Sequence, residues 1–247
     1  LVASAFISRG GQVVQEVHPA FGTTDFGPYL AQLDPSADVV VLWEPGADGL
    51  HFIEQFANYA GQKHPQIIDM GGAATSGNLA ELKDKGGAGV VVEAAWVDSI
   101  NNPQNQAFLK ALAAKFPNRQ GDPGLAQGWS TGAVLEQAFQ KTNGNVSDTQ
   151  GFLNALYATD VQTAMGEMKL DPSTRDIVRS YYVSKLAVKG NALGYQLMDT
   201  YNNVSQFWDR KPEDLRAFPY GKEKGKWVGM TKDQLAQIHG LTQAPAS

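Results

Sequence analysis

Hydrophobic and polar positions follow two different periods along the first hundred residues. Residues 38–43 end in five consecutive apolar side chains, which is typical of a parallel strand covered on both faces. Residues 66–70 and 89–94 are two further strand-like segments. Apolar residues at helical spacing predict helices at 2–9, 26–33, 47–59 and 79–83. Strands that alternate with helices predict βαβ units and a doubly wound α/β sheet.

The pattern becomes mainly helical after residue 101. Apolar spacing predicts helices at 105–116, 124–141 and 148–157, then strands at 168–170, 178–188 and 194–200, and a short helix at 231–239. Residues 98–103 lie between the two regions and are predicted to form a hinge crossing.

Composition narrows the function classes. The chain has 247 residues, of which 43% are hydrophobic and 18% charged, so it can bury a sizeable core. A net charge of −5 argues against nucleic-acid binding. The absence of cysteine excludes disulfides and thiol chemistry.

The apolar runs are only strand-length, so we predict no membrane-spanning segment. The first seven residues fit the middle of a helix, and we therefore expect the chain to be a fragment.

Motifs for catalysis are weak throughout. The four histidines are scattered without metal-ligand spacing. The glycine-rich segment 71–77 follows a strand but lacks both GxGxxG and the P-loop lysine. Ser130 sits between glycines but within a helical pattern, whereas a nucleophile elbow follows a strand. We therefore predict no enzyme activity, no cofactor and no metal site.

Five segments carry a family resemblance, and they occur in a characteristic order. They are Gly-Thr-Thr-Asp-Phe to Pro-Tyr-Leu at 22–30, Trp-Glu-Pro-Gly-Ala-Asp at 43–48, Met-Gly-Gly-Ala at 70–73, Ala-Gln-Gly-Trp at 126–129, and Met-Lys-Leu-Asp-Pro to Arg at 168–175. Over roughly residues 1–200 the chain resembles the periplasmic solute-binding proteins of ABC transporters, in the branch that binds leucine, isoleucine and valine.

The resemblance implies a two-lobed type I fold with doubly wound parallel sheets, in which the N-terminal part of the first lobe is absent from this chain. Residues 1–97 would form ligand-binding lobe 2 without its first strand, and 98–175 a mainly helical part of lobe 1. Residues 176–202 would be return strands to lobe 2, and 203–247 a C-terminal extension. The resemblance further implies a periplasmic or extracytoplasmic receptor whose precursor carries a signal peptide, with or without a lipid anchor. Such a receptor would deliver a small ligand to ABC permease membrane domains.

Ligands of open α/β sheets bind beyond the carboxyl ends of the strands. The site residues predicted there, with Trp129 added from the resemblance to lobe 1, are Trp43, Glu44, Pro45, Gly46, Met70, Gly72, Ala73, Trp96 and Trp129. The alternative for Trp43 and Met70 is ordinary packing between sheet and helix, and the same alternative holds for the other two tryptophans.

Glu44 is the sharpest polar candidate, because a carboxylate at a strand end can accept hydrogen bonds from a ligand ammonium or hydroxyl. The alternative is a solvated loop acid or a charge partner of a helix N-terminus. Amino-acid-binding relatives use an acidic residue near the glycine-rich loop to hold the α-ammonium, and Gly72 and Ala73 stand at those positions here. Either the ligand lacks an ammonium group or Glu44 holds it. A small amino acid and a carboxylic acid, aromatic acids included, both remain candidates.

Two other function classes remain open from the sequence. The first is a ligand-sensing regulatory domain of the same fold. The second is an unrecognised enzyme on a doubly wound α/β sheet.

Overall fold

The computed structural model describes residues 2–59, 64–74, 76–190, 192–208, 210–213 and 226–237. The helical segments are α1 (Val2–Ser8), α2 (Gly27–Leu30), α3 (Gly46–Asn58), the 3-10 turn η1 (Ser76–Asn78), α4 (Leu79–Leu82), α5 (Pro103–Lys115), α6 (Pro123–Lys141), α7 (Thr149–Tyr157) and α9 (Lys232–Ala236). The strands are β1 (Val39–Leu42), β2 (Gln66–Asp69), β3 (Val91–Ala94), β4 (Asp160–Thr163), β5 (Gly166–Leu170), β6 (Ile177–Lys189) and β7 (Ala192–Val204).

These strands form one seven-stranded sheet in the order β1-β2-β3-β6-β5-β4, with β7 paired to β6. β1, β2 and β3 are parallel to their neighbours in this group, as their apolar runs predicted. β6 is antiparallel to β3, β5 and β7. β6 and β4 therefore run against the direction of the first three strands, whereas β5 and β7 run with them, and the sheet is mixed.

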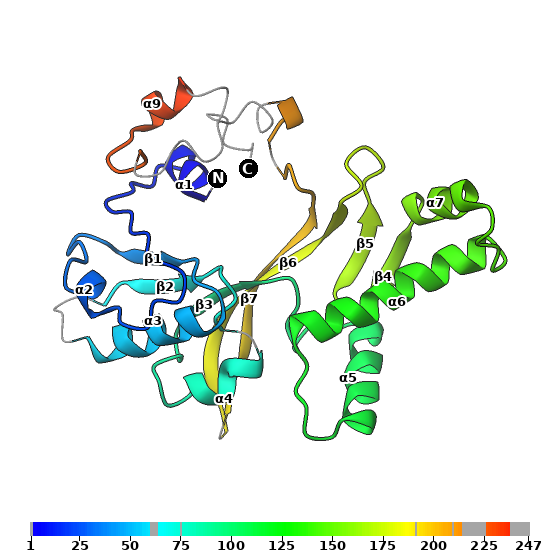
Figure 1. Cartoon of the computed structure of the whole chain (residues 1–247), viewed down its shortest axis with the longest axis horizontal. Helices are drawn as coiled ribbons and strands as arrows, with labels where there is room; N and C mark the ends of the chain where they lie inside the picture. Colours follow the sequence, from blue (N-terminus) through cyan, green and yellow to red (C-terminus); the bar gives the residue numbers. More distant parts are fainter. Residues whose placement is uncertain are drawn as a thin grey trace.

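β6 and β7 are much longer than the other strands, at 13 residues each. At about 3.3 Å per residue, such a strand spans roughly 40 Å. Figure 1 shows the two strands running between the part that holds β1–β3 and the part that holds α5–α7. The β6–β7 pairing has two register shifts, between Arg179 and Tyr181 and between Val183 and Ser184.

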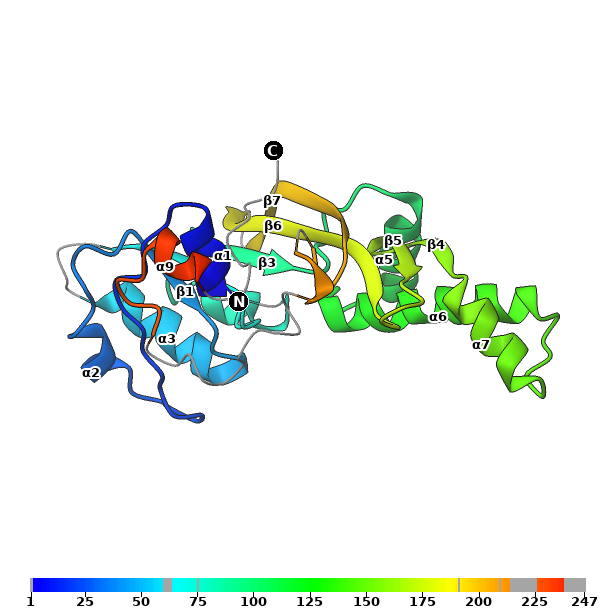
Figure 2. The same ribbon diagram turned by 90° about the horizontal axis from the view of Figure 1, so that it is seen from above.

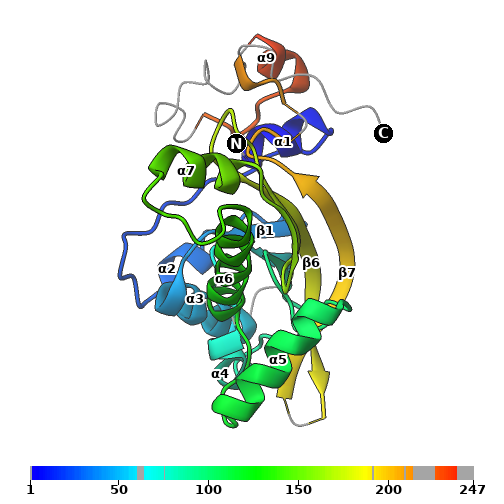
Figure 3. The ribbon, with the colours of Figure 1, turned by 90° about the vertical axis from the view of Figure 1, so that its right-hand side faces the viewer.

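The first core lies between the helices α3 and α4 and the sheet formed by β1–β3, the C-terminal part of β6 and the N-terminal part of β7. Phe52 and Ile53 of α3, Leu82 of α4 and Leu186 of β6 are buried there. Figure 3 shows α2 and α3 on one side of the sheet, with the long β7 strand on the other side of the view.

A second core lies among α5, α6 and the β4–β5 hairpin. Trp96, Phe108 of α5, Val134 of α6 and Met168 of β5 are buried in it. Ile100 packs against both cores. The chain therefore passes from one core to the other at residues 95–102, which include most of the predicted hinge crossing, and again along β6. Seen from above in Figure 2, the parts around the two cores form the two ends of an elongated molecule.

β4 is an element that the sequence did not predict. Its four residues, Asp160–Thr163, contain one large apolar side chain, Val161, so neither period is visible. The strand exists because it pairs with β5 through a tight turn, in which Thr163 Oγ1 donates to the carbonyl oxygen of Gly166 at 2.8 Å.

A third, small cluster joins the two ends of the described chain. Ile7 of α1 packs with Trp227 and with Leu235 of α9. Residues 209, 214–225 and 238–247 of the predicted C-terminal extension, together with the end of the predicted helix 231–239, lie outside the described residues. None of the helices within the described ranges has the length and apolar character needed to cross a bilayer.

Candidate functional site

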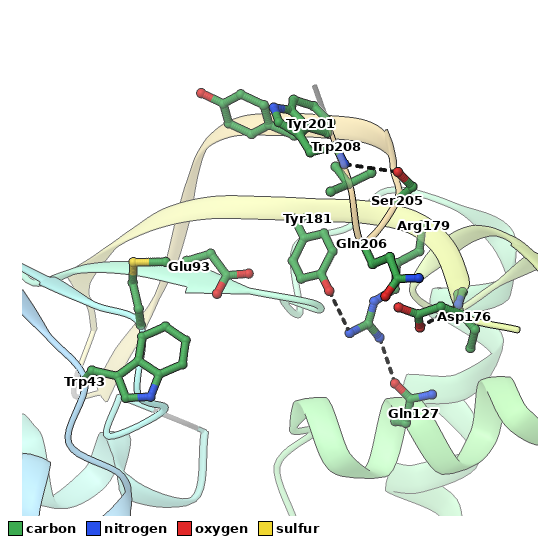
Figure 4. A pocket seen from close by; sticks show the side chains of 13 residues that line it. Trp43, Glu93, Gln127, Asp176, Arg179, Tyr181, Tyr201, Ser205, Gln206 and Trp208 are labelled. Carbon is green, nitrogen blue, oxygen red and sulfur yellow. Dashed lines mark hydrogen bonds between the residues drawn. The ribbon is translucent and has the colours of Figure 1, made fainter. Parts of the chain in front are cut away.

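A groove of about 640 Å³ opens between the two cores, at the carboxyl ends of β1 and β2. Figure 4 shows side chains from both directions pointing into it, including Glu93 from β3, Gln127 from α6 and Arg179 from β6. Its lining residues are Trp43, Met70, Glu93, Gln127, Asp176, Ile177, Arg179, Tyr181, Tyr201, Val204, Ser205, Gln206 and Trp208.

Strand register places the polar side chains on one face of the sheet. Glu93 of β3 is paired with Val183 of β6, so their side chains project to the same face. Because side chains alternate along a strand, Tyr181 and Arg179 share that face with Val183. Trp43 directly follows β1 and Met70 directly follows β2, so both reach the same edge of the sheet.

Arg179 supplies the positive charge of the groove. Its Nη1 donates to Gln127 Oε1 at 2.8 Å, and its Nη2 donates to the Tyr181 hydroxyl at 3.3 Å. The guanidinium carbon also lies 4.9 Å from the centroid of the Tyr181 ring. Both hydrogen-bond acceptors are uncharged, and among the described residues no carboxylate lies within ion-pair distance of Arg179.

Two carboxylates also face the groove. Burial raises the pKa of Glu93, Arg179 opposes this shift, and Asp69 adds to it. Asp176 is exposed, and its Oδ1 accepts a hydrogen bond from the backbone N–H of Ile177 at 2.8 Å. The groove thus combines one cation with an acidic group on either side of it.

Aromatic side chains form much of the remaining wall. Trp43 exposes 65% of its surface, and Tyr201 and Trp208 expose 44% and 45%. The last two pack edge to face, with ring centroids 5.9 Å apart. Large aromatic side chains that gather around a concave, partly polar surface are typical of small-molecule sites.

Of the predicted site residues, Trp43 and Met70 line the groove together. Glu44, Pro45 and Gly46 follow Trp43 but are not among the lining residues. Burial and the Asp48 carboxylate raise the pKa of Glu44, and His18 opposes them. The assignment of a ligand ammonium to Glu44 stays a prediction.

The predicted residues Gly72 and Ala73 belong to a loop organised by Asp69 at the end of β2. The fully buried Asp69 carboxylate accepts hydrogen bonds from the backbone N–H groups of Gly71 at 3.0 Å and Ala74 at 2.7 Å. Burial raises the pKa of Asp69, while these loop hydrogen bonds lower it. A Cβ at Gly71 would lie 2.7 Å from the backbone nitrogen of Glu44, so the close approach seen here is between two loops.

The two predicted tryptophans near the second core lie outside the lining of the groove. Trp96 has no exposed surface, and its Nε1 donates to Asn105 Oδ1 at 2.9 Å. Its ring packs edge to face on Phe108. Trp129 of α6 also packs against Phe108, with ring centroids 5.8 Å apart, and is partly exposed.

Comparison with known families decides the classification. The family model for a periplasmic binding protein matches residues 2–191. The chain belongs to the periplasmic binding protein family. This confirms the resemblance and the type I α/β fold class that were predicted from the sequence. A comparison with curated proteins gave no significant match.

Solved structures agree with this membership in the periplasmic binding protein family. An ABC transporter substrate-binding protein from Sphaerobacter thermophilus superposes with a TM-score of 0.74 at 22% identity, covering 79% of this chain and 54% of that one. A solute-binding protein of an ABC transporter from Rhodopseudomonas palustris HaA2, in complex with p-hydroxybenzoic acid, gives 0.70 at 23% identity with the same coverage.

A leucine-binding protein from Thermotoga maritima MSB8 gives a TM-score of 0.62 at 20% identity, covering 78% of this chain and 53% of that one. The chain therefore spans about half the length of the solved binding proteins that it matches. These neighbours are transport binding proteins rather than enzymes.

Sequence reasoning missed most of the polar groove residues of this periplasmic binding protein. Arg179 and Tyr181 stand two residues apart in a strand that was predicted correctly, and the alternation of strand faces was the signal that could have paired them. Glu93 needed the long-range pairing of β3 with β6, which no local pattern reveals. In the part of the chain that the structure describes, no group of three or more histidine or acidic side chains could hold a metal ion.

Proposed function

We propose that this chain is part of an extracytoplasmic solute-binding receptor of an ABC importer, which captures a small amino acid or carboxylic acid between two lobes. The proposal includes delivery of the ligand to the permease membrane domains. The lobe boundaries predicted from the sequence, at residues 1–97 and 98–175, belong to the same proposal.

One observation carries it: the groove is lined by residues from both sides of the crossing between the cores. Trp43 and Met70 come from the side of the first core, and Gln127 comes from α6, which contributes to the second. A ligand in this position touches both sides at once. Such a ligand favours the closed arrangement, because only that arrangement completes its contacts.

The chemistry of the groove supports an organic acid as ligand. A guanidinium binds carboxylates through paired hydrogen bonds, and the exposed rings of Trp43 and Trp208 suit a flat apolar body. The Rhodopseudomonas palustris neighbour holds p-hydroxybenzoic acid, and the Thermotoga maritima neighbour is a leucine-binding protein. Both ligand classes belong to the proposal.

A thermal-shift screen of the full-length protein tests the function. The screen contains amino acids, aromatic acids, short dicarboxylates and uncharged sugars. A specific ligand at a hundred times its dissociation constant stabilises the protein by about 2.7 kcal/mol, which is a shift of several degrees. The proposal is wrong if no solute raises the melting temperature while an enzymatic turnover assay responds.

A further inference from the structure

The guanidinium of Arg179 is a half-buried cation without an ionic partner among the described residues. It carries five N–H groups, and the two hydrogen bonds described above go to neutral oxygens of Gln127 and Tyr181. These bonds fix the plane of the guanidinium, and Figure 4 shows it projecting into the middle of the groove. An oriented cation of this kind is suited to receive one carboxylate with little loss of side-chain freedom.

The acidic groups of the groove limit what the rest of the ligand can carry. Glu93 projects from β3 on the same face of the sheet as Arg179, and its carboxyl group is partly removed from water. Asp176 lies beside the start of β6 and also lines the groove. A second ligand carboxylate near either group meets a like charge, which is costly where solvent screening is reduced.

We propose that the groove selects monocarboxylates, with the ligand carboxylate on Arg179 and an uncharged or cationic hydrogen-bond donor directed toward Glu93. This assignment rests on the proposed function and makes Arg179 and Glu93 the residues that determine specificity. Glu93 accepts a hydrogen bond from a ligand hydroxyl or ammonium, and Trp43 contacts the body of the ligand.

Titration calorimetry of the full-length protein tests the assignment with matched probes. The probes are 4-hydroxybenzoate, its neutral analogue 4-hydroxybenzamide, the dicarboxylate terephthalate, and the pair leucine and leucinamide. We expect at least one of the two acids to bind, about tenfold to a hundredfold more tightly than its amide, the range for a charged hydrogen bond. Terephthalate binds at least about tenfold more weakly than 4-hydroxybenzoate if the aromatic acid is the ligand.

Two variants locate the effect. Arg179→Gln should weaken the acid by about tenfold to a hundredfold and leave the amide within about threefold, so that the acid-to-amide ratio approaches one. Glu93→Gln should raise the affinity for terephthalate by about tenfold. Arg119→Gln is the matched control, because Arg119 is exposed, lies outside the groove, and pairs with Asp122 at 3.5 Å. This control should change no ratio.

The outcomes separate the assignment from the function. An unchanged acid-to-amide ratio in Arg179→Gln overturns the assignment, as does a wild-type protein that binds acid and amide equally. The acid-to-amide comparison on the wild type remains decisive if the variants do not fold. Binding of an uncharged sugar, with neither acid bound, rejects the monocarboxylate assignment but leaves the receptor function standing. Failure of every solute in the thermal screen, together with a response in the enzymatic turnover assay, rejects the function itself.

Discussion

Replacing Trp96 with phenylalanine tests whether this residue stabilises the second core or contacts the ligand. The sequence placed Trp96 among the predicted ligand contacts, two residues beyond β3. In the structure its indole is fully buried and donates a hydrogen bond to Asn105. Asn105 in turn donates through Nδ2 to the carbonyl oxygens of Asp98 at 3.1 Å and Ile100 at 2.9 Å, so it holds the segment where the chain leaves the first core.

The magnitude of the effect follows from two losses. Phenylalanine has no N–H group, so Asn105 Oδ1 loses its hydrogen-bond donor. Because Asn105 is only 1% exposed, water cannot replace that donor, and the unsatisfied oxygen costs about 1–3 kcal/mol. The smaller ring leaves a cavity of roughly 40 Å³, which at about 24 cal/mol per Å³ costs about 1 kcal/mol. The sum is about 2–4 kcal/mol of unfolding free energy. For a protein of this size that corresponds to a fall in melting temperature of about 4–16 °C.

The assay is thermal unfolding followed by circular dichroism, together with ligand titration on the same samples. Trp129→Phe is the control, because Trp129 contacts the same Phe108 ring but is 46% exposed, and it should lose less than about 1 kcal/mol. Ligand affinity should be unchanged in Trp96→Phe well below its melting temperature. A large loss of affinity at an unchanged melting temperature would show that Trp96 contacts the ligand and that the packing argument is wrong.

Two further predictions concern the loop after β2. Burial raises the pKa of Asp69 above its ordinary value of 3.8, so the folded protein binds this proton more tightly than the unfolded chain. Its contribution to stability is therefore largest at low pH and falls as the pH rises from 3.8 through the raised pKa. The melting-temperature difference between wild type and Asp69→Asn should shrink over that interval. A difference that grows with pH contradicts the argument. Gly71→Ala should lose about 1–3 kcal/mol in urea unfolding, because the added Cβ meets the backbone of Glu44. Gly128→Ala, in a helix with nothing within 4 Å, should instead gain about 0.4–1 kcal/mol, and equal effects of the two substitutions would refute the steric reasoning.

The local pattern of apolar residues was sufficient to predict the strands that form the edge of the groove. The apolar runs before Trp43 and Met70 predicted both strands, and the rule that ligands bind beyond strand ends then selected these two residues. The same rule selected Trp96, whose indole lies in the second core, bonded to Asn105 and outside the lining of the groove. A sequence does not show on which side of the chain a buried partner lies, and the ligand contact of Trp96 stays a prediction.

The polar half of the groove depends on contacts between distant segments. Arg179 meets Gln127 across 52 positions of sequence, and Glu93 reaches the same face only through its pairing with Val183. Neither contact has a periodic signature. The predicted carboxylate was therefore Glu44, the acid adjacent to a visible strand end, and Glu93, which lines the groove, was not identified.

The interrupted pairing of β6 and β7 has a mechanical consequence. One interruption falls between Arg179 and Tyr181, next to the cation of the groove, and the other falls at Val183, the neighbour of Glu93 across the sheet. Irregular positions bend and twist more readily than a continuous ladder, and they re-aim the side chains beside them. In the closure that we propose, we expect the β6–β7 ribbon to flex beside Arg179 and beside the strand partner of Glu93. The distance between these two opposite charges would then change as the lobes close, so the same irregularities would couple the movement to the contacts with the ligand.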